Sequence, residues 1–479
     1  MFKKNMENTR LIVNYVLGRA RRVYFMAIPE NKEELKKSRI YFTISDACAQ
    51  TIVQLAGGTF LVSLMAYVGI SDANIGVIIS LGSFLALFQL ITLGYVRVLK
   101  KYKFFVCVTA LQRIFFVLMY FVPVLFVDNR WQVILLVIFY CIAQGCIQIG
   151  TPATQDWIAS LVPGRLRGRY LSIKDSVVVA MVATVMLGGG MLLDYFKRTD
   201  IVIGFCLIGM IILILVMINV VCLSLMKEPR VAYVNGEGKE MHGRLSKPMK
   251  EQEKSCKQES LGVEVKKALS SSHFIKMITL NCLWMTCFYI ASPFNASYQI
   301  KELALPYTFI MVIGFLSNLV RIYLTPKIGK MADRYGMAKI LKYVMFALGV
   351  SYLMTAFTVP GNAYVMTMIG TSFAALGWTF IGPGLFGLQL EFLDKDKRVI
   401  QLTILSSLSG VYGFGVSCVG GRILNYLQHN PLELWGRPIY AQQVLNVIGF
   451  LMILITVGYI KVFVESERIK VSNQDGKVM

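Results

Sequence analysis

Charged residues are scarce in this sequence. Asp, Glu, Lys and Arg make up 16% of its 479 residues, hydrophobic residues make up 56%, and the mean hydropathy is +0.60. An ordinary soluble domain carries about 25% charged residues. The shortage therefore argues against a soluble protein and predicts an integral membrane protein. The formal net charge is +22. In a membrane protein the distribution of these positive residues indicates which loops face the cytoplasm, and we expect no nucleic-acid partner.

Histidines and paired cysteines are scarce as well. The three histidines are scattered, and the ten cysteines occur singly in apolar segments without Cys-x-x-Cys spacing. No metal site or disulfide framework is readable from this pattern, and we expect the cysteines to be buried as small hydrophobic residues. The phosphate-binding motif Gly-x-x-x-x-Gly-Lys-Ser/Thr is missing, so ATP-driven transport is not expected. The sequence predicts neither an enzyme nor a cofactor.

Apolar stretches, in contrast, are long and numerous. Each has about 20 residues, which is the length a helix needs to cross the hydrocarbon core of a bilayer. The sequence therefore predicts an all-α integral membrane protein that is embedded in a lipid bilayer by twelve transmembrane helices. The stretches cover residues 41–66, 75–96, 104–127, 131–153, 172–193, 201–225, 274–298, 307–327, 339–359, 363–388, 400–421 and 442–463.

These stretches fall into two groups of six and divide the chain into five parts. The parts are a basic cytoplasmic N-terminal segment (1–40), an N-terminal six-helix bundle (41–225), a polar cytoplasmic linker (226–273), a C-terminal six-helix bundle (274–463) and a cytoplasmic tail (464–479). Residues 1–40 lack the features of a signal peptide. Within them, residues 9–28 fit either a helix on an anionic membrane surface or a solvated tail.

Lysine and arginine residues set the expected orientation. If the N-terminus is cytoplasmic, most of the 49 basic residues fall in or beside cytoplasmic segments. The outer segments then hold only Arg130, Lys197, Arg198, Lys301 and Arg437. Because cytoplasmic loops of membrane proteins carry an excess of Lys and Arg, both termini are expected in the cytoplasm. We expect a multi-pass protein of the plasma (inner) membrane.

The two predicted bundles share a short internal repeat. Gly189-Gly190-Met191-Leu192-Leu193-Asp194-Tyr195 ends the fifth stretch, and Gly420-Gly421-Arg422-Ile423-Leu424-Asn425-Tyr426 ends the eleventh, with identical spacing. Transporters built from two related halves carry weak repeats of this kind. A chance match within glycine-rich membrane sequence is the alternative.

A charged octapeptide identifies the class of membrane protein. Gly329-Lys330-Met331-Ala332-Asp333-Arg334-Tyr335-Gly336 lies between the eighth and ninth stretches. It resembles the cytoplasmic loop signature of the major facilitator superfamily of secondary transporters. Glycines at its two ends permit backbone angles that other residues avoid, so we expect a short turn across Gly329–Gly336.

This resemblance implies a major facilitator fold of two pseudo-symmetric six-helix bundles. It further implies alternating access to a midplane site for a small-molecule substrate, with a coupling cation, expected to be a proton, and a monomeric protein. In such proteins the loop latches the two halves on the cytoplasmic side. The predicted latch residues are Gly329, Asp333, Arg334, Gly336, Arg167 and Arg169.

A polar stripe marks the first predicted helix. Asp46, Gln50 and Gln54 recur every four residues and so share one helix face. A carboxylate in apolar surroundings exchanges protons more readily near neutral pH, so Asp46 is the candidate for proton coupling and Gln50 and Gln54 for substrate binding. The alternative is a fixed salt bridge from Asp46 to Arg113 or Lys174.

Arg113 lies nine residues into the third stretch, about 14 Å deep at 1.5 Å per residue. An arginine at such a depth costs about 2.5–3.5 kcal/mol, so it needs a partner or a function. Two interpretations remain open. Arg113 either binds substrate or forms a structural ion pair within the first bundle.

Neutral amides and tryptophans complete the predicted site. Amides exchange hydrogen bonds with hydroxyl groups, and flat rings cover the apolar face of a sugar. The predicted substrate-binding residues of this kind are Gln144, Gln148, Asn281, Trp284 and Trp378. Hydrogen bonding between neighbouring helices is the alternative role for each amide.

The sequence predicts proton-coupled uptake of a sugar, glycoside or similar polar organic solute. Proton-driven multidrug efflux is a second hypothesis, because 24 methionines and 29 phenylalanines offer an adaptable apolar cavity. A non-transporting sensor on a transporter scaffold, with the linker as its binding surface, is a third.

Overall fold

The structure of the protein is a computed structural model. It describes residues 32–89, 92, 102–126, 128–161, 167–227, 232–234, 240–242, 271–393, 398–434 and 437–465. The predicted surface helix at 9–28 lies outside the described residues.

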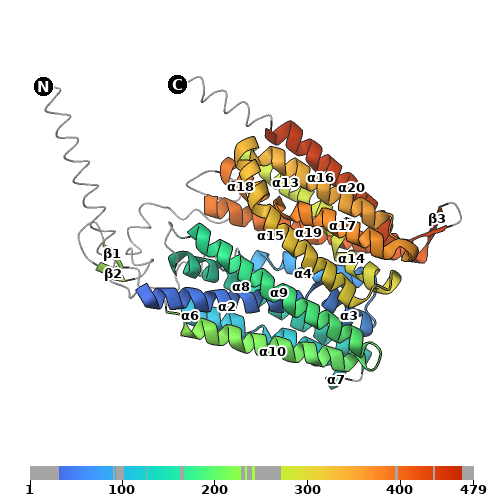
Figure 1. Cartoon of the computed structure of the whole chain (residues 1–479), viewed down its shortest axis with the longest axis horizontal. Helices are drawn as coiled ribbons and strands as arrows, with labels where there is room; N and C mark the ends of the chain where they lie inside the picture. Colours follow the sequence, from blue (N-terminus) through green and yellow to red (C-terminus); the bar gives the residue numbers. More distant parts are fainter. Residues whose placement is uncertain are drawn as a thin grey trace.

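The first half of the chain forms a bundle of helices that lie side by side (Figure 1). Backbone amides and carbonyls have no water to bond within a bilayer, and a helix satisfies them internally. The helices are α2 (Lys32–Leu55), α3 (Gly58–Tyr67), α4 (Asp72–Phe84), α6 (Tyr102–Leu111), α7 (Ile114–Leu125), α8 (Asn129–Leu161), α9 (Arg167–Phe196) and α10 (Ile201–Leu225).

The second half forms a similar bundle beside the first (Figure 1). Its α-helices are α13 (Ser272–Tyr289), α14 (Ser292–Ser297), α15 (Tyr307–Tyr335), α16 (Met337–Ala356), α17 (Ala363–Trp378), α18 (Ile381–Phe392), α19 (Arg398–His429) and α20 (Ala441–Tyr459). Shorter helical turns are η2 (Tyr298–Glu302), η3 (Pro360–Asn362) and η4 (Ile460–Glu465).

Two antiparallel hairpins are the strands in the described part of the chain. The first pairs β1 (Ala232–Val234) with β2 (Glu240–His242), within the stretch expected to be the linker. The second pairs β3 (Leu432–Leu434) with β4 (Arg437–Ile439), between α19 and α20.

The described residues contain 12 segments that are long and apolar enough to cross a membrane, and each overlaps one of the predicted stretches. The predicted all-α membrane fold is therefore confirmed. Several spans are interrupted, which the apolar pattern did not indicate. In the third span the chain leaves regular helix at Gln112–Arg113, where Arg113 N donates to Ala110 O at 3.1 Å. In the seventh, Ile290–Ala291 separate α13 from α14.

Each half has its own hydrophobic core. Phe60, Phe116 and Phe205 are fully buried in the first, and Phe274 and Leu341 in the second. Three residues that follow α14, namely Ile300, Tyr307 and Met311, pack into the first core. The two halves thus share a core at the end where odd-numbered spans finish, which the basic residues predict to be extracellular.

The signature octapeptide is more helical than predicted. Helix α15 continues through Gly329 to Tyr335. Gly336, which follows the end of the helix, is the one residue of the octapeptide with positive φ, at +96°. The predicted turn across Gly329–Gly336 is therefore wrong at its start, because α15 extends past the apolar stretch into the charged residues. Arg334 lies over the ring of Tyr335, 5.3 Å from its centroid. The side chains of Asp333, Arg167 and Arg169 lie outside the described part, so the predicted latch stays a prediction.

Candidate functional site

A cavity of about 350 Å³ lies between the two halves of the chain. Helices α2 and α9 of the first half and α15 of the second half form its wall. Its polar lining residues are Asp46, Gln50, Gln54, Lys174, Asp175, Asn318 and Arg321. Lys174 is the first residue of the fifth span, so the cavity reaches the membrane face that is predicted to be cytoplasmic.

Helix α2 presents its predicted polar stripe to this cavity. Asp46, Gln50 and Gln54 all line it, one turn apart. Cys48 and Ile52, on other faces of the helix, are buried in the core of the first half. The polar face turns towards the cavity and the apolar residues turn into the core, which fixes the orientation of α2 about its own axis.

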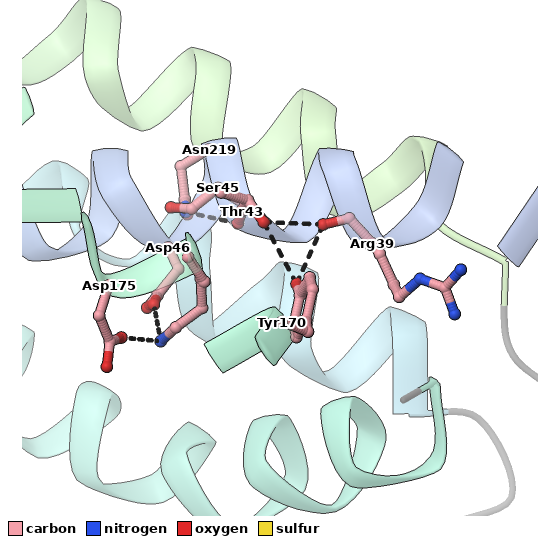
Figure 2. Close-up of polar contacts among 8 residues, drawn as sticks. Arg39, Thr43, Ser45, Asp46, Tyr170, Asp175 and Asn219 are labelled. Atoms are coloured by element: carbon pink, nitrogen blue, oxygen red, sulfur yellow. Dashed lines mark hydrogen bonds and ion pairs between the residues drawn. The ribbon is translucent and has the colours of Figure 1, made fainter. Parts of the chain in front are cut away.

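An ion-pair network closes one side of the cavity. Lys174 Nζ lies 2.6 Å from Asp46 Oδ2 and 3.1 Å from Asp175 Oδ1. Figure 2 shows both carboxylates directed at this one amine. The side chains of Asp46 and Lys174 are only 17% and 16% exposed, while Asp175 is 68% exposed. Of the two partners considered for Asp46, Lys174 is the one within ion-pair distance.

A hydrogen-bonded chain behind Asp46 holds α2 in place. Asn219 Nδ2 on α10 donates to the carbonyl and hydroxyl oxygens of Ser45, at 2.7 and 2.9 Å. Nearer the start of α2, Tyr170 OH donates to Arg39 O at 3.0 Å and lies 3.3 Å from Thr43 Oγ1 (Figure 2). These bonds fix the position of Asp46 along both neighbouring helices, α9 and α10.

Arg113 belongs to this supporting layer. Its Nη1 donates to Asn219 Oδ1 at 3.0 Å, while its buried Nε has no hydrogen-bond partner among the described residues. It does not line the cavity. Its partner here is a neutral amide rather than a carboxylate.

Helix α15 supplies the opposite wall. Met311, Gly314, Phe315, Asn318 and Arg321 all line the cavity and follow helical spacing. The Arg321 side chain is exposed, and no ion pair to it occurs among the described residues. Asn318 and Arg321 were not among the predicted substrate-binding residues, although two polar residues on one face of an apolar helix were a usable signal.

Two of the other amides predicted to bind substrate, Gln148 and Asn281, form bonds between helices. Gln148 Nε2 donates to Gly82 O at 3.2 Å, and its Oε1 accepts from Gln89 at 2.5 Å. Gln144 Nε2 lies 3.5 Å from Tyr140 OH. In the second half, Asn281 is buried and accepts from Gln389 Nε2 at 3.1 Å. The contacts of Gln148 and Asn281 thus match the helix-to-helix alternative, whereas that of Gln144 lies within α8.

A second, uncharged cavity of about 170 Å³ lies within the second half. It is formed by α14, η2, α16 and α17. Trp378 lines it, and Trp284 packs edge-on against Trp378 with ring centroids 5.7 Å apart. The polar lining residues are Ser292, Asn295, Gln299, Ser351, Tyr352, Thr355, Thr358, Thr367 and Thr371.

Some hydroxyl groups that line this second cavity are left as acceptors. Thr355 Oγ1 and Thr371 Oγ1 each donate to a helix carbonyl, at 3.0 and 2.7 Å, which leaves their lone pairs to face the cavity. Tyr352 OH has no hydrogen-bond partner in the described part of the chain. Such a lining suits a neutral molecule with several hydroxyl donors.

Twelve membrane-spanning segments with a charged cavity between two bundles define a membrane transporter rather than an enzyme. The model of the Major Facilitator Superfamily matches residues 43–423, and the chain belongs to this family. No curated protein matches the chain.

Solved structures share the fold at low sequence identity. A point mutant of the nucleoside transporter NupG is 10% identical, with TM-score 0.64 over 89% of this chain and 100% of that one. A D-xylose-proton symporter is 14% identical, with TM-score 0.62 over 88% and 97%. A bacterial homologue of the iron transporter ferroportin, in an inward-facing state, is 13% identical, with TM-score 0.57 over 89% and 99%.

Proposed function

We propose that this transporter works by alternating access and takes up a sugar, glycoside or similar neutral polar solute together with protons. The cytoplasmic and extracellular ends are those predicted from the basic residues. On this assignment the structure is open towards the cytoplasm. The proposal places the protein in the plasma membrane as a monomer with both termini inside.

The observation that carries the proposal is one amine held between two carboxylates at the wall of a cavity between the bundles. Asp46 and Lys174 are largely shielded from water, and shielded charges in membrane-spanning segments mark ion or proton pathways. Lys174 belongs to α9 and Asp46 to α2. A change in the charge of Asp46 therefore alters how two helices of the first bundle hold together.

The geometry allows a balanced proton step. A proton that adds to Asp46 Oδ2 neutralises the carboxylate and removes its attraction for Lys174. The amine keeps a counter-charge because Asp175 Oδ1 lies 3.1 Å away. Protonation thus releases α2 from α9 without leaving an unpaired buried charge, and loss of the proton restores the 2.6 Å pair.

Solute binding is assigned to the uncharged cavity and its tryptophan wall. Acceptor oxygens of Thr355 and Thr371 and the free hydroxyl of Tyr352 bind the hydroxyl groups of the solute. The ring of Trp378 covers an apolar face. Two of the similar structures bear names of polyhydroxylated solutes, a nucleoside and D-xylose.

Transport in proteoliposomes tests the proposal. We expect D-xylose or uridine, the probes used, to accumulate against a gradient when the outside is acidic. Asp46→Asn should abolish accumulation but keep exchange of labelled for unlabelled solute, because exchange needs no net proton transfer. Asp200→Asn is the matched control, since among the described residues the Asp200 side chain caps α10 through a 2.9 Å bond from Val202 N and makes no other hydrogen bond. Accumulation by Asp46→Asn equal to the parent would overturn the coupling role.

Proton-driven efflux of lipophilic cations is the second candidate. It is favoured by the apolar part of the cavity wall, which includes Val178, Val182, Met186, Met311 and Phe315. Methionine and aromatic linings adapt to varied ligands. If tetraphenylphosphonium is transported and no sugar or nucleoside is, the cavity between the bundles rather than the uncharged one binds the substrate.

A further inference from the structure

The bundles pack closely near their predicted extracellular ends. Gly421 of α19 faces α4, where an added Cβ would lie 3.2 Å from Ala73 O. Gly190 of α9 faces α15, where an added Cβ would lie 3.2 Å from Tyr307 O. These two glycines occupy the same position of the internal repeat. The repeat therefore marks two related crossings between the halves.

One turn beyond Gly190, a carboxylate spans the first crossing. Asp194 Oδ1 accepts from Tyr307 N at 2.9 Å, and its Oδ2 accepts from Thr308 N at 2.6 Å. Asp194, a residue of the first half, thus caps the first turn of α15 in the second half. Ser63 Oγ lies 2.6 Å from Tyr307 OH and adds a further bond between the halves. All the donors to Asp194 are uncharged.

A second carboxylate spans the other crossing and has a charged partner. Asp72 begins α4 and is 8% exposed. Its Oδ1 lies 2.5 Å from Lys301 Nζ and also accepts from Ser297 Oγ, while its Oδ2 accepts from Gln428 Nε2 at 3.2 Å. Ser297 and Lys301 belong to the seventh span and Gln428 to α19. One side chain of the first half is therefore held by two helices of the second.

Separation of the halves at this end must break this ion pair. The side chain of Asp72 is 9% exposed and that of Lys301 is 33% exposed, so the pair is largely shielded from water and its attraction is weakly screened. Asp194 loses only hydrogen bonds to neutral amides when the same end opens. The two crossings are thus alike in position and unlike in charge.

We propose that Asp72 and Lys301 are the gating residues of the predicted extracellular end. Their ion pair, rather than the Asp194 cap, sets how often this end opens. In the open state both charges are hydrated. Neutralising either one therefore removes a contact that only the closed state makes and shifts the population towards the open state.

Spin-label distances test the proposal without a substrate and without assumptions about orientation. Tyr195 and Tyr426 are equivalent positions of the repeat at this end, one in each half, and are 69% and 66% exposed. Each is replaced by a spin-labelled cysteine in the full chain. The nine cysteines among the described residues are buried or half-buried. Labelled protein without the two substitutions gives the background.

We expect Asp72→Asn and Lys301→Met each to raise the ratio of long to short separations about tenfold or more, because each leaves one largely buried charge unpaired in the closed state. Asp200→Asn, a carboxylate at the same end that bonds only within its own half, should leave the distribution unchanged. The charge exchange Asp72→Lys with Lys301→Asp should restore most of the short separation.

Two outcomes would overturn the proposal. The first is that both single variants keep the parent distribution. The second is that Asp72→Asn lengthens the distance while Lys301→Met does not, which would mean that the ion pair does not hold this end closed. Should one single variant fail to fold, the other must still show the longer separation, because either substitution leaves the opposite charge unpaired in the closed state.

Discussion

The Nζ atom of Lys174 lies 2.6 Å from Oδ2 of Asp46, although the two residues are 128 positions apart in the sequence. Asp175, next to Lys174, offers a second carboxylate at 3.1 Å. The lysine therefore serves both as the bond between α2 and α9 and as the group that the proposed proton releases. Its two partners differ mainly in exposure.

Removal of Lys174 should destabilise the protein more than removal of Asp175. Lys174→Met leaves Asp46 without its ion-pair partner, and we expect a loss of about 1–3 kcal/mol, between the values for exposed and buried pairs. Asp175→Asn should cost at most about 0.5 kcal/mol because Asp175 is 68% exposed. Apparent melting temperatures in detergent measure both. Equal losses would show that Asp175, not Asp46, carries the stabilising pair.

Tyr352→Phe should weaken solute binding without loss of stability. Tyr352 lines the uncharged cavity, and no hydrogen bond to its hydroxyl occurs among the described residues, so its removal breaks no such bond. A solute hydroxyl that loses this partner should bind about tenfold more weakly. Proteoliposome uptake should show a higher KM with coupling retained, the reverse of Asp46→Asn. A Tyr352→Phe protein with unchanged KM would place the solute elsewhere.

The twelve spans and the face of α2 were predictable because the bilayer imposes both. Hydrocarbon requires long apolar helices, and a polar stripe such as Asp46, Gln50 and Gln54 must turn away from lipid. Lys174 as the partner of Asp46 was one of two options left open, since no local pattern says which distant helix packs beside α2. Gln148 and Asn281 were harder still, because an amide that binds a helix and one that binds a solute look alike in sequence.

The ends of helices were also hard to predict from the sequence, for a different reason. The octapeptide identified the family, yet its first glycine continues a helix and its last one breaks it. Nothing in the apolar pattern marks the end of α15, because charged residues extend a helix beyond the membrane as readily as they form a loop. The pairing of Asp72 with Lys301 was equally out of reach, since Asp72 lies before the predicted second stretch.

The two glycines of the signature should respond oppositely to alanine. Gly336 has φ of +96°, which an alanine adopts only with strain, so Gly336→Ala should cost more than about 1 kcal/mol. Gly329 is helical, and an added Cβ there would meet no atom within 4 Å. Gly329→Ala should therefore gain up to about 1 kcal/mol from helix propensity. Melting temperatures that fall for both variants would contradict the helical assignment of Gly329.

A close backbone approach between the halves at Gly410 gives the last test. An added Cβ at Gly410 of α19 would lie 2.4 Å from Ser83 O of α4, and a backbone carbonyl cannot turn aside as a side chain can. Gly410→Ala should therefore push α19 from α4 and cost about 1–3 kcal/mol. Gly415, five residues along the same helix, has no atom within 4 Å of an added Cβ.

Gly415→Ala is thus the matched control and should be neutral or stabilising by up to about 1 kcal/mol. The spin-label pair at positions 195 and 426 should lengthen in Gly410→Ala and stay unchanged in Gly415→Ala, because only the first disturbs the contact between the halves. If both variants behave alike, α19 and α4 do not pack at Gly410 in the stable state. The closed end would then depend on contacts nearer that end, such as the ion pair of Asp72 and the cap of Asp194.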